Sequence, residues 1–480
     1  MGSEWSEIAL ADCLAFVVDN RGKSAPLEDQ GIPLIATNCI SNENTYPVYE
    51  RVRYVSEDTF NNWFRSHPLP GDVILTNKGS KNGAVCLVPS PVEFCIAQDM
   101  VALRANKAVI DPLYLFAILR SKVVQDRIKN LNVDSVIPHF KKTDFDKLFL
   151  PYPSRKTQEF IGRFYFYFCE KIELNRQINT TLESMAQALF KSWFVDFDPV
   201  IDNALAAGNE IPDALAARAA RREALRQQTN ETSNKTTGAT DADSSEQALT
   251  DTGLSDQRLP SEIQQRFPDR FVFTEEMGWV PEGWGIESLD RIANYQNGLA
   301  LQKFRPEDES NFLPVVKIAQ LKKGYADGEE KASPNIKPEC IIDDGDVVFS
   351  WSGSLMVDVW CGGRAALNQH LFKVTSDEYP KWFFLHFTLH HLTEFQRIAA
   401  DKAVTMGHIK REHLSQAKCS VPGMDFMEKL SPFFDPLLNK AVLSRLENRA
   451  LIDLRDSLLP KLLSGQITIP DAEQQLAEVL

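Results

Sequence analysis

Gly71-Asp-Val-Ile-Leu-Thr76, followed by Gly79-Ser80, recurs in the second half of the chain as Gly345-Asp-Val-Val-Phe-Ser350, followed by Gly353-Ser354. Each copy places an acidic turn residue before a short run of apolar, β-branched or aromatic side chains, which is typical of a strand between two turns. The glycine-serine turn follows at the same distance in both copies. The shared stretch indicates that the chain contains one structural plan twice.

Further matches occur in the same order on both sides of this stretch. They are Trp5 with Trp284, Pro33 with Pro314, Gln98 with Gln369, His139 with His408, and Lys141 with Lys410. The offset falls from 279 residues at the tryptophans to 269 at the histidines, as small loop deletions would cause. Matches in colinear order are much less frequent by chance than single ones, so the sequence predicts an internal duplication.

Each half begins with short segments of strand character and continues with amphipathic stretches of helical period. The strand candidates are Asp72–Thr76, Ala84–Val88, Asp346–Ser350 and Leu371–Thr375, and the helix candidates are Leu113–Lys129 and Trp382–Ala399. This order predicts an α+β domain of about 150 residues, present twice.

Each half then ends in a long stretch with the period of a coiled coil. In the first, the candidate core positions alternate by three and four residues: Ile161, Phe164, Phe168, Lys171, Asn175, Ile178, Leu182, Met185 and Leu189. In the second they are Leu443, Leu446, Ala450, Leu454 and Leu458. Either stripe alone is also compatible with a helix packed on its own domain. Two matched stripes favour helices that pair with each other.

These features predict five segments. They are a first α+β domain (1–155), a central coiled-coil helix (156–200), a spacer (201–279), a second α+β domain (280–423) and a C-terminal coiled-coil helix with a tail (424–480). The spacer should begin as a helix, because residues 201–226 are rich in Ala, Arg and Glu. From Gln227 to Pro260 it contains no aromatic residue, Ile or Val, which predicts a flexible linker.

No catalytic or metal-binding motif is recognisable, so the sequence predicts a protein that is not an enzyme. A glycine-rich cofactor loop with an Asn/Asp-Pro-Pro-aromatic motif is absent, and so is a P-loop. His390, His391 and Glu394 do not have the spacing of a zinc protease. Asp343, Asp344 and Asp346 are explained more simply as a turn before a strand.

Composition limits the class of protein further. The eight cysteines form no C-x-x-C pair, which favours reduced, buried thiols in a cytoplasmic protein. No apolar run is long enough for a membrane span, and the start of the chain lacks a secretory signal. The net charge of −14 argues against strong autonomous binding to nucleic acid. A DNA-reading role would therefore need local basic loops or a partner that supplies phosphate contacts.

The order of domain, long helix, spacer, domain and long helix resembles the specificity subunits of type I restriction-modification systems. Three motifs carry the resemblance. Glu183-Ser-Met-Ala-Gln-Ala-Leu-Phe-Lys-Ser-Trp-Phe-Val-Asp-Phe197 is similar to the central repeat region of the family. Leu454-Arg-Asp-Ser-Leu-Leu-Pro-Lys-Leu-Leu-Ser-Gly465 is similar to its C-terminal repeat, and Pro281-Glu-Gly-Trp284 to the start of a target-recognition domain. The resemblance covers almost the whole chain, although the polar spacer is long for the family.

The resemblance implies two target-recognition domains joined and separated by two long antiparallel coiled-coil helices, with pseudo-two-fold internal symmetry. Each domain would read half of a bipartite, asymmetric site in double-stranded DNA. Two copies of a methyltransferase subunit would bring S-adenosylmethionine and methylate adenine, and a motor-nuclease subunit with ATP and magnesium would give restriction. No cofactor is expected in this chain. The alternatives are a non-enzymatic coiled-coil interaction scaffold and a decayed specificity subunit.

Candidate DNA-contacting residues are polar and basic side chains in predicted loops, where they can reach base edges or phosphates. In the first domain they are Arg21, Lys23, Asn77, Lys78, Lys81, Asn82, His139, Lys141 and Lys142. In the second they are Lys303, Arg305, Lys322, Lys323, Ser352, Arg364, His408, Lys410 and Arg411. Of these, the matched pairs His139/Lys141 and His408/Lys410 are the preferred candidates. The alternative interpretation of these residues is a hydrogen-bonded structural turn before a strand.

Overall fold

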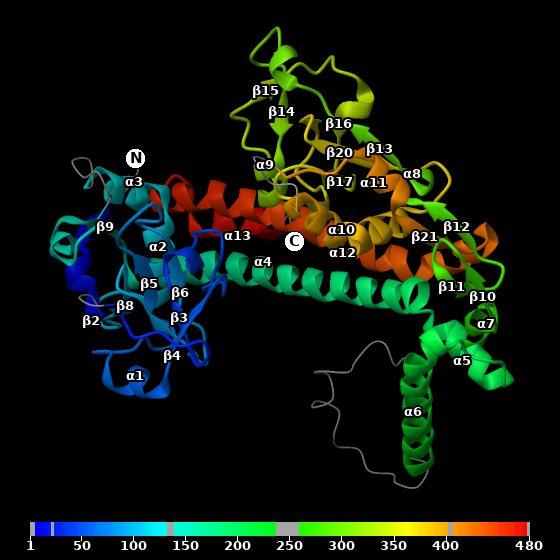
Figure 1. Cartoon of the computed structure of the whole chain (residues 1–480). Helices are drawn as coiled ribbons and strands as arrows, with labels where there is room; N and C mark the ends of the chain where they lie inside the picture. Colours follow the sequence, from blue (N-terminus) through cyan, green and yellow to red (C-terminus); the bar gives the residue numbers. More distant parts are fainter. Residues whose placement is uncertain (1–4, 21–23, 132–138, 237–258, 402–406, 478–480) are drawn as a thin grey trace. The chain divides into compact units, whose positions relative to one another are not determined.

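The computed structural model describes residues 5–20, 24–131, 139–236, 259–401 and 407–477 (Figure 1). The chain forms two compact units: unit 1 comprises Met1–Arg176 with Glu447–Leu480, and unit 2 comprises Gln177–Leu446. Helix α4 (Arg155–Phe190) and helix α12 (Met424–Leu463) each contribute one part to unit 1 and the other part to unit 2.

Unit 1 contains an α+β module (residues 5–152), here called module 1. Its four-stranded antiparallel sheet has the order β2 (Leu14–Val18), β8 (Met100–Ala105), β5 (Val73–Thr76) and β6 (Val85–Leu87). A second sheet has the order β4 (Arg53–Val55), β3 (Ile32–Ile35) and β7 (Cys95–Ile96), and β3 runs parallel to β7. Strand β1 (Ser6–Ala9) pairs antiparallel with β9 (Phe149–Tyr152), so the two ends of the module meet.

The α-helices of module 1, unlike its 3-10 helices, begin after residues whose side chains cap them. The elements are η1 (Leu10–Cys13), η2 (Thr37–Cys39), α1 (Glu57–Asn62), α2 (Pro112–Arg120), α3 (Lys122–Asn130) and η3 (Lys142–Lys147). Asp111 accepts hydrogen bonds from the first backbone N–H groups of α2, and Pro112 occupies its first position. Ser121 ends α2 and caps α3 in the same way.

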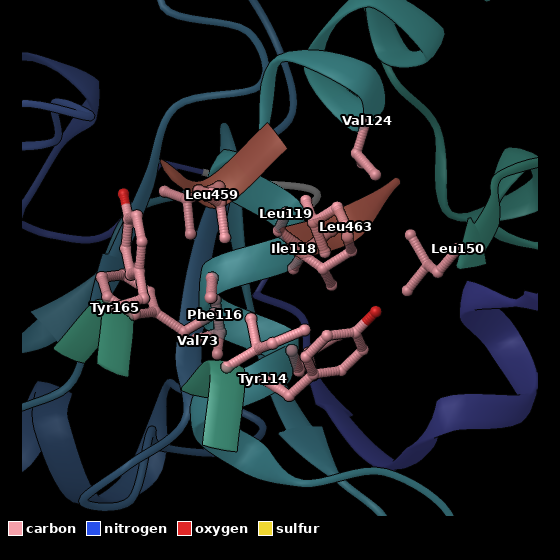
Figure 2. Packing of buried hydrophobic residues seen from close by; sticks show 14 of the residues in the cluster. Val73, Tyr114, Phe116, Ile118, Leu119, Val124, Leu150, Tyr165, Leu459 and Leu463 are labelled. Carbon is pink, nitrogen blue, oxygen red and sulfur yellow. The ribbon is translucent and has the colours of Figure 1, made fainter. Parts of the chain in front are cut away.

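The core of unit 1 combines module 1 with the two long helices (Figure 2). Val73 of β5 and Phe116 of α2 belong to the same buried cluster as Tyr165 of α4 and Leu459 of α12. Gly162 permits the close approach of α4 to α2, because a Cβ atom there would lie 2.5 Å from the Tyr114 nitrogen. Residues from the end of the chain therefore complete the core of the first module. Helix α13 (Ile469–Ala477) also contributes Ala472 to this cluster.

Unit 2 contains a second α+β module (residues 285–421), here called module 2. One sheet has the order β13 (Asn294–Asn297), β20 (Leu371–Thr375), β17 (Val347–Ser350) and β18 (Met356–Val359). The other has the order β15 (Lys331–Ala332), β14 (Leu313–Val316), β19 (Ala365–Leu367) and β16 (Ile341–Ile342), with β14 parallel to β19. Strand β12 (Gly285–Ser288) pairs with β21 (Lys418–Val421), and β10 (Phe271–Thr274) forms a hairpin with β11 (Gly278–Pro281) before the module.

The helices of unit 2 include the long α10, which packs against the sheet of β17 and β20. The elements are η4 (Lys191–Val195), α5 (Asp198–Ala207), α6 (Asp213–Thr236), α7 (Ser261–Gln264), α8 (Leu289–Ile292), η5 (Leu301–Lys303), α9 (Ile318–Lys323), η6 (Pro338–Cys340), α10 (Lys381–Asp401) and α11 (Arg411–Gln416). Helix α10 places Trp382, Phe383 and Phe387 in the core cluster of unit 2.

The two modules share one topology, which confirms the predicted duplication and the α+β class. The sheet order β2-β8-β5-β6 in module 1 corresponds to β13-β20-β17-β18 in module 2. Even single hydrogen bonds recur: Leu10 N donates to Leu148 O over 2.9 Å, and Leu289 N donates to Ala417 O over 2.9 Å. The parallel pair β3–β7 likewise corresponds to β14–β19.

Helices α4 and α12 pair antiparallel within each unit. In unit 1, the Arg455 guanidinium lies 5.4 Å from the Tyr165 ring, whereas Asn448 contacts the later residue Asn175. In unit 2, Arg445 contacts Glu183, and the Phe434 ring lies 5.3 Å from the ring of Trp193 in η4, which directly follows α4. In both units, later residues of α4 contact earlier residues of α12, as antiparallel helices require.

The buried seam differs from the predicted one on α12. Buried positions on this helix alternate mostly by three and four residues: Met427, Leu430, Phe434, Ala441, Ser444, Asn448, Leu451, Arg455, Leu458 and Leu462. Leu458 was predicted correctly, but Leu443 is 62% exposed and does not lie in the seam. The prediction followed the leucines, whereas polar residues occupy the buried positions Ser444, Asn448 and Arg455. Leu446 and Leu454 are half-buried beside the seam.

On α4, the predicted core positions are buried or half-buried. Phe164 and Phe168 are buried, and Ile178, Leu182, Met185 and Leu189 are half-buried. Asn179 is buried, whereas the predicted core residue Ile178 beside it is only half-buried. The helix therefore contributes two neighbouring buried amides, Asn175 and Asn179, to the seam.

The spacer begins as a helical hairpin. Arg218 of α6 donates to both carboxylate oxygens of Asp198 over 2.7 Å, and Arg222 pairs with Asp202, which holds α6 against α5. Burial alone would raise the pKa of Asp198, but the hydrogen bonds from Arg218 and Ser192 outweigh this effect and lower it. Helix α6 continues to Thr236, beyond the predicted start of the linker at Gln227. Residues 237–258 of that predicted linker lie outside the described residues.

Candidate nucleic-acid interface

In module 1, three separate chain segments meet beyond the end of β5. Lys78 and His139 form an isolated antiparallel bridge. The backbone N–H of Phe140 donates to Oδ1 of Asn82 over 3.2 Å, and Asn77 N donates to Asp99 O over 3.1 Å. We call this set edge 1, comprising residues 77–82, 98–99 and 139–142.

In module 2, three corresponding segments meet beyond the end of β17 and share two connections with edge 1. Ser352 and His408 form an isolated antiparallel bridge, and the neighbouring Ile409 N donates to Trp351 O over 3.0 Å. Trp351 N donates to His370 O over 3.4 Å, as Asn77 N does to Asp99 O in module 1. We call this set edge 2, comprising residues 351–353, 369–370 and 407–411.

The preferred sequence candidates therefore occupy equivalent places in the two modules. His139 and His408 lie in the third segment of their edges, opposite Lys78 and Ser352. Lys141 and Lys410, two residues later, directly precede the short helices η3 and α11 and are both exposed. The structure assembles these matched residues with the loop after β5 or β17, which the sequence alone could not show.

Edge 1 presents several exposed cations. Lys81, Lys141 and Lys142 are exposed, and the Lys78 ammonium lies 4.0 Å from the carboxylate of Asp99. Asn77 is different: its side chain is 1% exposed, and its amide nitrogen has no hydrogen-bond partner among the described residues. Asn77 therefore lies beneath the surface of the edge rather than on it.

Edge 2 is built from rings and hydroxyls as well as cations. The hydroxyl of Ser352 lies 3.0 Å from Nδ1 of His370, and its residue is buried. Arg411 donates to Tyr295 O over 3.1 Å, and its guanidinium lies 5.5 Å from the Phe372 ring, so its position is fixed from two sides. His408 and Lys410 remain exposed.

The structure does not bring every predicted residue to these edges. Arg364 pairs with Asp343 at 3.3 Å, next to the turn that leads into β17, which is the opposite end of this strand from Ser352. Lys322 and Lys323 lie at the end of α9, where Lys323 pairs with Asp327. Lys303 is the last residue of η5, and Arg305 follows it. Arg21 and Lys23 lie outside the described residues.

Two residue pairs in the edges were missing from the predicted site. Gln98 with Asp99, and Gln369 with His370, form the middle segment of edges 1 and 2. Gln369 and His370 lie 3.4 Å apart through their side-chain nitrogens. The match of Gln98 with Gln369 between the halves was the available signal, because it marks a position common to both modules outside the strands.

Of the histidine pair of α10, His391 is half-buried and His390 is exposed. Nε2 of His391 lies 3.0 Å from Lys418 O, and burial, with a smaller effect of His390, lowers the pKa of His391 to about 4. No group of three or more His, Cys, Asp or Glu residues suited to a metal ion occurs in the part of the chain that the structure describes. All eight cysteines are buried and unpaired as thiols.

Comparison with known proteins identifies the family. The sequence profile described as "Type I restriction modification DNA specificity domain" matches residues 28–184 and 281–448, which together are more than half of the chain. The chain belongs to this family. The two matched regions each contain most of one module and part of a long helix, as the duplicated topology implies. Family members are the non-catalytic DNA-recognition subunits of type I restriction systems, and the chain is a specificity subunit of this kind.

Relatives of the family align over most of their length. The specificity subunit of the type I restriction enzyme HindI from Haemophilus influenzae is 25% identical over 83% of this chain and 86% of its own. The MjaIX specificity subunit from Methanocaldococcus jannaschii is 21% identical over 84% of this chain and 78% of its own. The crystal structure of a type I S subunit from M. genitalium is 13% identical, covers 97% of both chains and gives a TM-score of 0.47.

Among the described residues, no helix is both long and apolar enough to cross a membrane.

Proposed function

We propose that the chain reads a bipartite, asymmetric sequence in double-stranded DNA, with edge 1 on one half-site and edge 2 on the other. The observation that carries this proposal is the equivalence of the two bridges, Lys78 with His139 and Ser352 with His408. One scaffold thus presents two surfaces built from the same three segments. Repeated modules of this kind can contact two half-sites of one duplex.

The difference between the edges supports an asymmetric target. Edge 1 offers the ammonium groups of Lys78 and Lys81, which suit phosphate oxygens and the acceptor groups of guanine. Edge 2 has Ser352 at the place of Lys78 and His370 at the place of Asp99, together with the fixed Arg411. Because donors and acceptors differ, the two edges would select different bases.

The chain would act within a larger complex in the cytoplasm. Two copies of a methyltransferase subunit would use S-adenosylmethionine to methylate adenine in the recognised site, and a motor-nuclease subunit with ATP and magnesium would restrict unmethylated DNA. The net charge of −14 supports a role for partner subunits in DNA binding, because an acidic chain alone would bind the phosphate backbone weakly. The antiparallel helices α4 and α12 would set the gap between the half-sites.

The direct test is co-expression of the chain with the methyltransferase subunit encoded beside it, followed by mapping of N6-methyladenine across the host genome. The proposal predicts one new split motif that disappears when either module is replaced by that of another specificity subunit. An unchanged methylation map from a verified complex would favour a decayed subunit or an interaction scaffold instead.

A further inference from the structure

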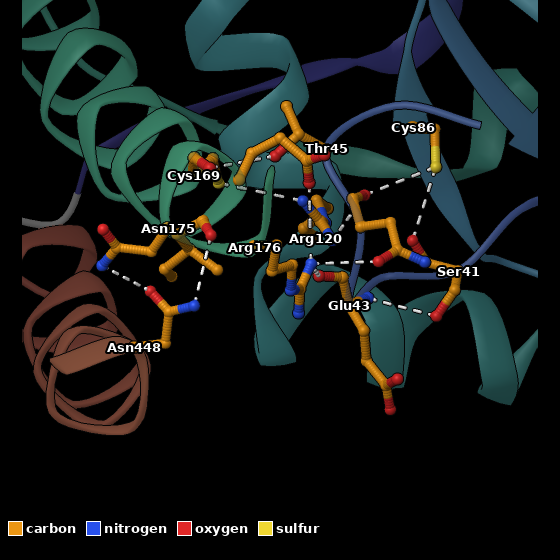
Figure 3. A network of polar contacts seen from close by, with 12 residues as sticks. Ser41, Glu43, Thr45, Cys86, Arg120, Cys169, Asn175, Arg176 and Asn448 are labelled. Carbon is orange, nitrogen blue, oxygen red and sulfur yellow. Dashed lines mark hydrogen bonds and ion pairs between the residues drawn. The ribbon is translucent and has the colours of Figure 1, made fainter. Parts of the chain in front are cut away.

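The outer edge of β6 in unit 1 is covered by a loop of the same module, residues 41–46. Leu87 N donates to Thr45 O over 2.8 Å, and Val85 N donates to Oδ1 of Asn42 over 2.8 Å. The thiol of Cys86, between them, points to Asn44 O at 3.5 Å (Figure 3). The loop therefore satisfies the backbone donors that the edge of the sheet would otherwise leave open.

Helices hold this loop from its other side. Arg120 of α2 donates to Asn44 O over 3.3 Å, and Arg176 of α4 donates to Glu43 O over 3.0 Å (Figure 3). The Thr45 hydroxyl donates to Cys169 O of α4 over 3.3 Å. The loop thus fills the space between β6, α2 and α4.

In unit 2, the counterpart of β6 is β18. Val88 N donates to Asp72 O over 2.9 Å at the end of β6, and Trp360 N donates to Asp346 O over 2.8 Å at the end of β18. This register makes Val357 and Val359 the counterparts of Val85 and Leu87. The chain after β14 forms α9, whereas the corresponding chain after β3 leads into the covering loop.

A cavity of about 120 Å³ lies where the loop would be. Its walls come from β18, α10, α4 and α12, and β18, α10 and α12 are the counterparts of the three elements that hold the loop in unit 1. Most of the lining is aliphatic, including Leu182, Leu385, Leu389, Leu438 and Val442, and the polar end is formed by Glu183, Asp358 and Arg445.

At this cavity, the backbone of β18 presents the N–H and C=O groups of one residue, Val357, to a possible partner strand. Val359 N donates to the Asp358 carboxylate over 2.8 Å, and Arg445 donates to Val359 O over 2.9 Å. In an antiparallel ladder, alternate residues face away from the partner strand, so the N–H and C=O of Val357 also point outward. Among the described residues, neither group has a hydrogen-bond partner. An extended peptide could exchange two hydrogen bonds with this residue.

We propose that β18 and its cavity form the docking site for an extended peptide segment of the methyltransferase subunit. One residue of that segment would pair with Val357, and an adjacent aliphatic side chain would fill the cavity. Glu183 and Asp358 outnumber Arg445, so a basic residue in the segment would complement the polar end. The corresponding segment of this chain folds as α9 and does not line the cavity, so we assign the site to a segment of another polypeptide. This inference rests on the proposed function.

The site has a consequence for stoichiometry. Because the equivalent place in unit 1 is filled by residues 41–46, the docking site occurs once in the part of the chain that the structure describes. Of the two methyltransferase copies in the proposed complex, only one would use it. Loss of the site should therefore remove one copy and leave the other bound.

The test compares full-length variants by native mass spectrometry with the purified methyltransferase subunit. Val357→Pro removes the outward N–H without touching a bond to β17, and Val442→Trp fills the cavity from α12. Leu443→Trp is the matched control, because this neighbouring side chain is 62% exposed and does not line the cavity. Thermal unfolding and hydrogen exchange of each variant alone establish that it is folded.

The proposal predicts two bound copies for the parent chain and the control, and one for Val357→Pro and Val442→Trp, with affinity for the second copy reduced at least tenfold. Amide exchange at Val357 should slow on assembly. Unchanged binding of both copies by the two folded variants, or unchanged exchange at Val357, would overturn the docking site alone. Absence of any complex with the parent chain would overturn the proposed function and the docking site with it.

Discussion

The side-chain amide of Asn175 on α4 donates a hydrogen bond of 2.9 Å to Oδ1 of Asn448 on α12. Asn175 also donates to the Glu447 carboxylate over 3.0 Å, and the Asn448 amide donates to Ile172 O over 3.3 Å. Both asparagines are buried, at 3% and 8% exposure. These bonds can form in only one register of the antiparallel helices, so the pair selects that register.

Replacement of one asparagine should cost more than replacement of both. Asn175→Leu leaves the buried oxygen of Asn448 without its donor and should lower the free energy of unfolding by about 1–3 kcal/mol. Asn175→Leu with Asn448→Leu should restore most of the loss, because two apolar side chains pack together without an unsatisfied group. Urea unfolding of the four members of this double-mutant cycle measures the coupling. Losses that simply add would contradict the role of the pair.

Arg445 should stabilise unit 2 by joining α12 to α4 and to β18. Burial alone would lower the pKa of its guanidinium, but Asp358 and Glu183 raise it, so Arg445 stays charged. Arg445→Met leaves two carboxylates without their cation and should lower the free energy of unfolding by about 1–3 kcal/mol after allowance for partial exposure. Arg449→Met, on an exposed part of α12, is the control and should have a smaller effect. Equal effects of the two variants in urea unfolding would argue against the bridge.

His386 should make unit 2 less stable in mild acid. Its ring stacks on Phe190, its Nδ1 lies 2.6 Å from Trp382 O, and burial lowers its pKa from 6.5 to about 4. The neutral ring is favoured in the folded state, so this contribution is full above pH about 6.5 and falls until the pH reaches about 4. The total change is ~3 kcal/mol.

The comparison of the parent chain with His386→Leu isolates this effect from the carboxylates. Between pH 7.5 and 4.5, the free energy of unfolding should fall less in the variant than in the parent chain. Urea unfolding followed by the fluorescence of tryptophans such as Trp382 measures the difference. Parallel pH profiles would show that His386 does not titrate with unfolding.

Lys141 and Lys142, in the third segment of edge 1, should act on phosphates rather than on bases. Lys141→Ala and Lys142→Ala should each weaken binding of the assembled complex to all DNA sequences and reduce the slope of log affinity against log salt by about 1. Fluorescence anisotropy over a range of salt concentrations measures this slope. Lys129→Ala on α3, outside edge 1, is the control. If neither Lys141→Ala nor Lys142→Ala changed the slope, the phosphate contacts would lie elsewhere.

The repeat and the α+β class could be predicted because the duplicated strand and turn motifs are local. Gly71–Thr76 and Gly345–Ser350 carry the signal within a few residues, and the colinear order supplies the rest. The seam of α12 could not be predicted from hydrophobic spacing, because the buried positions include Ser444, Asn448 and Arg455. A hydrophobic pattern cannot locate a seam whose polar groups are satisfied across helices.

The candidate site, too, could be predicted only in part from the sequence. His139 and His408 were matched by sequence, but their bridges to Lys78 and Ser352 depend on contacts between distant segments. Polarity alone does not separate a surface residue from a buried one. Asn77 and Ser352 are polar, but both side chains are almost fully buried at their edges.

Methylation maps of matched edge variants test whether each edge reads its own half-site. Lys78→Ala with His139→Gln alters edge 1, and Arg411→Ala with His408→Gln alters edge 2. Each pair would be co-expressed with the methyltransferase subunit. We expect the first pair to relax or abolish base selection in one half of the N6-methyladenine motif only, and the second pair to do so in the other half only. If either pair changed both halves alike, or left a motif unchanged while the complex assembled, the edges would not be the reading surfaces.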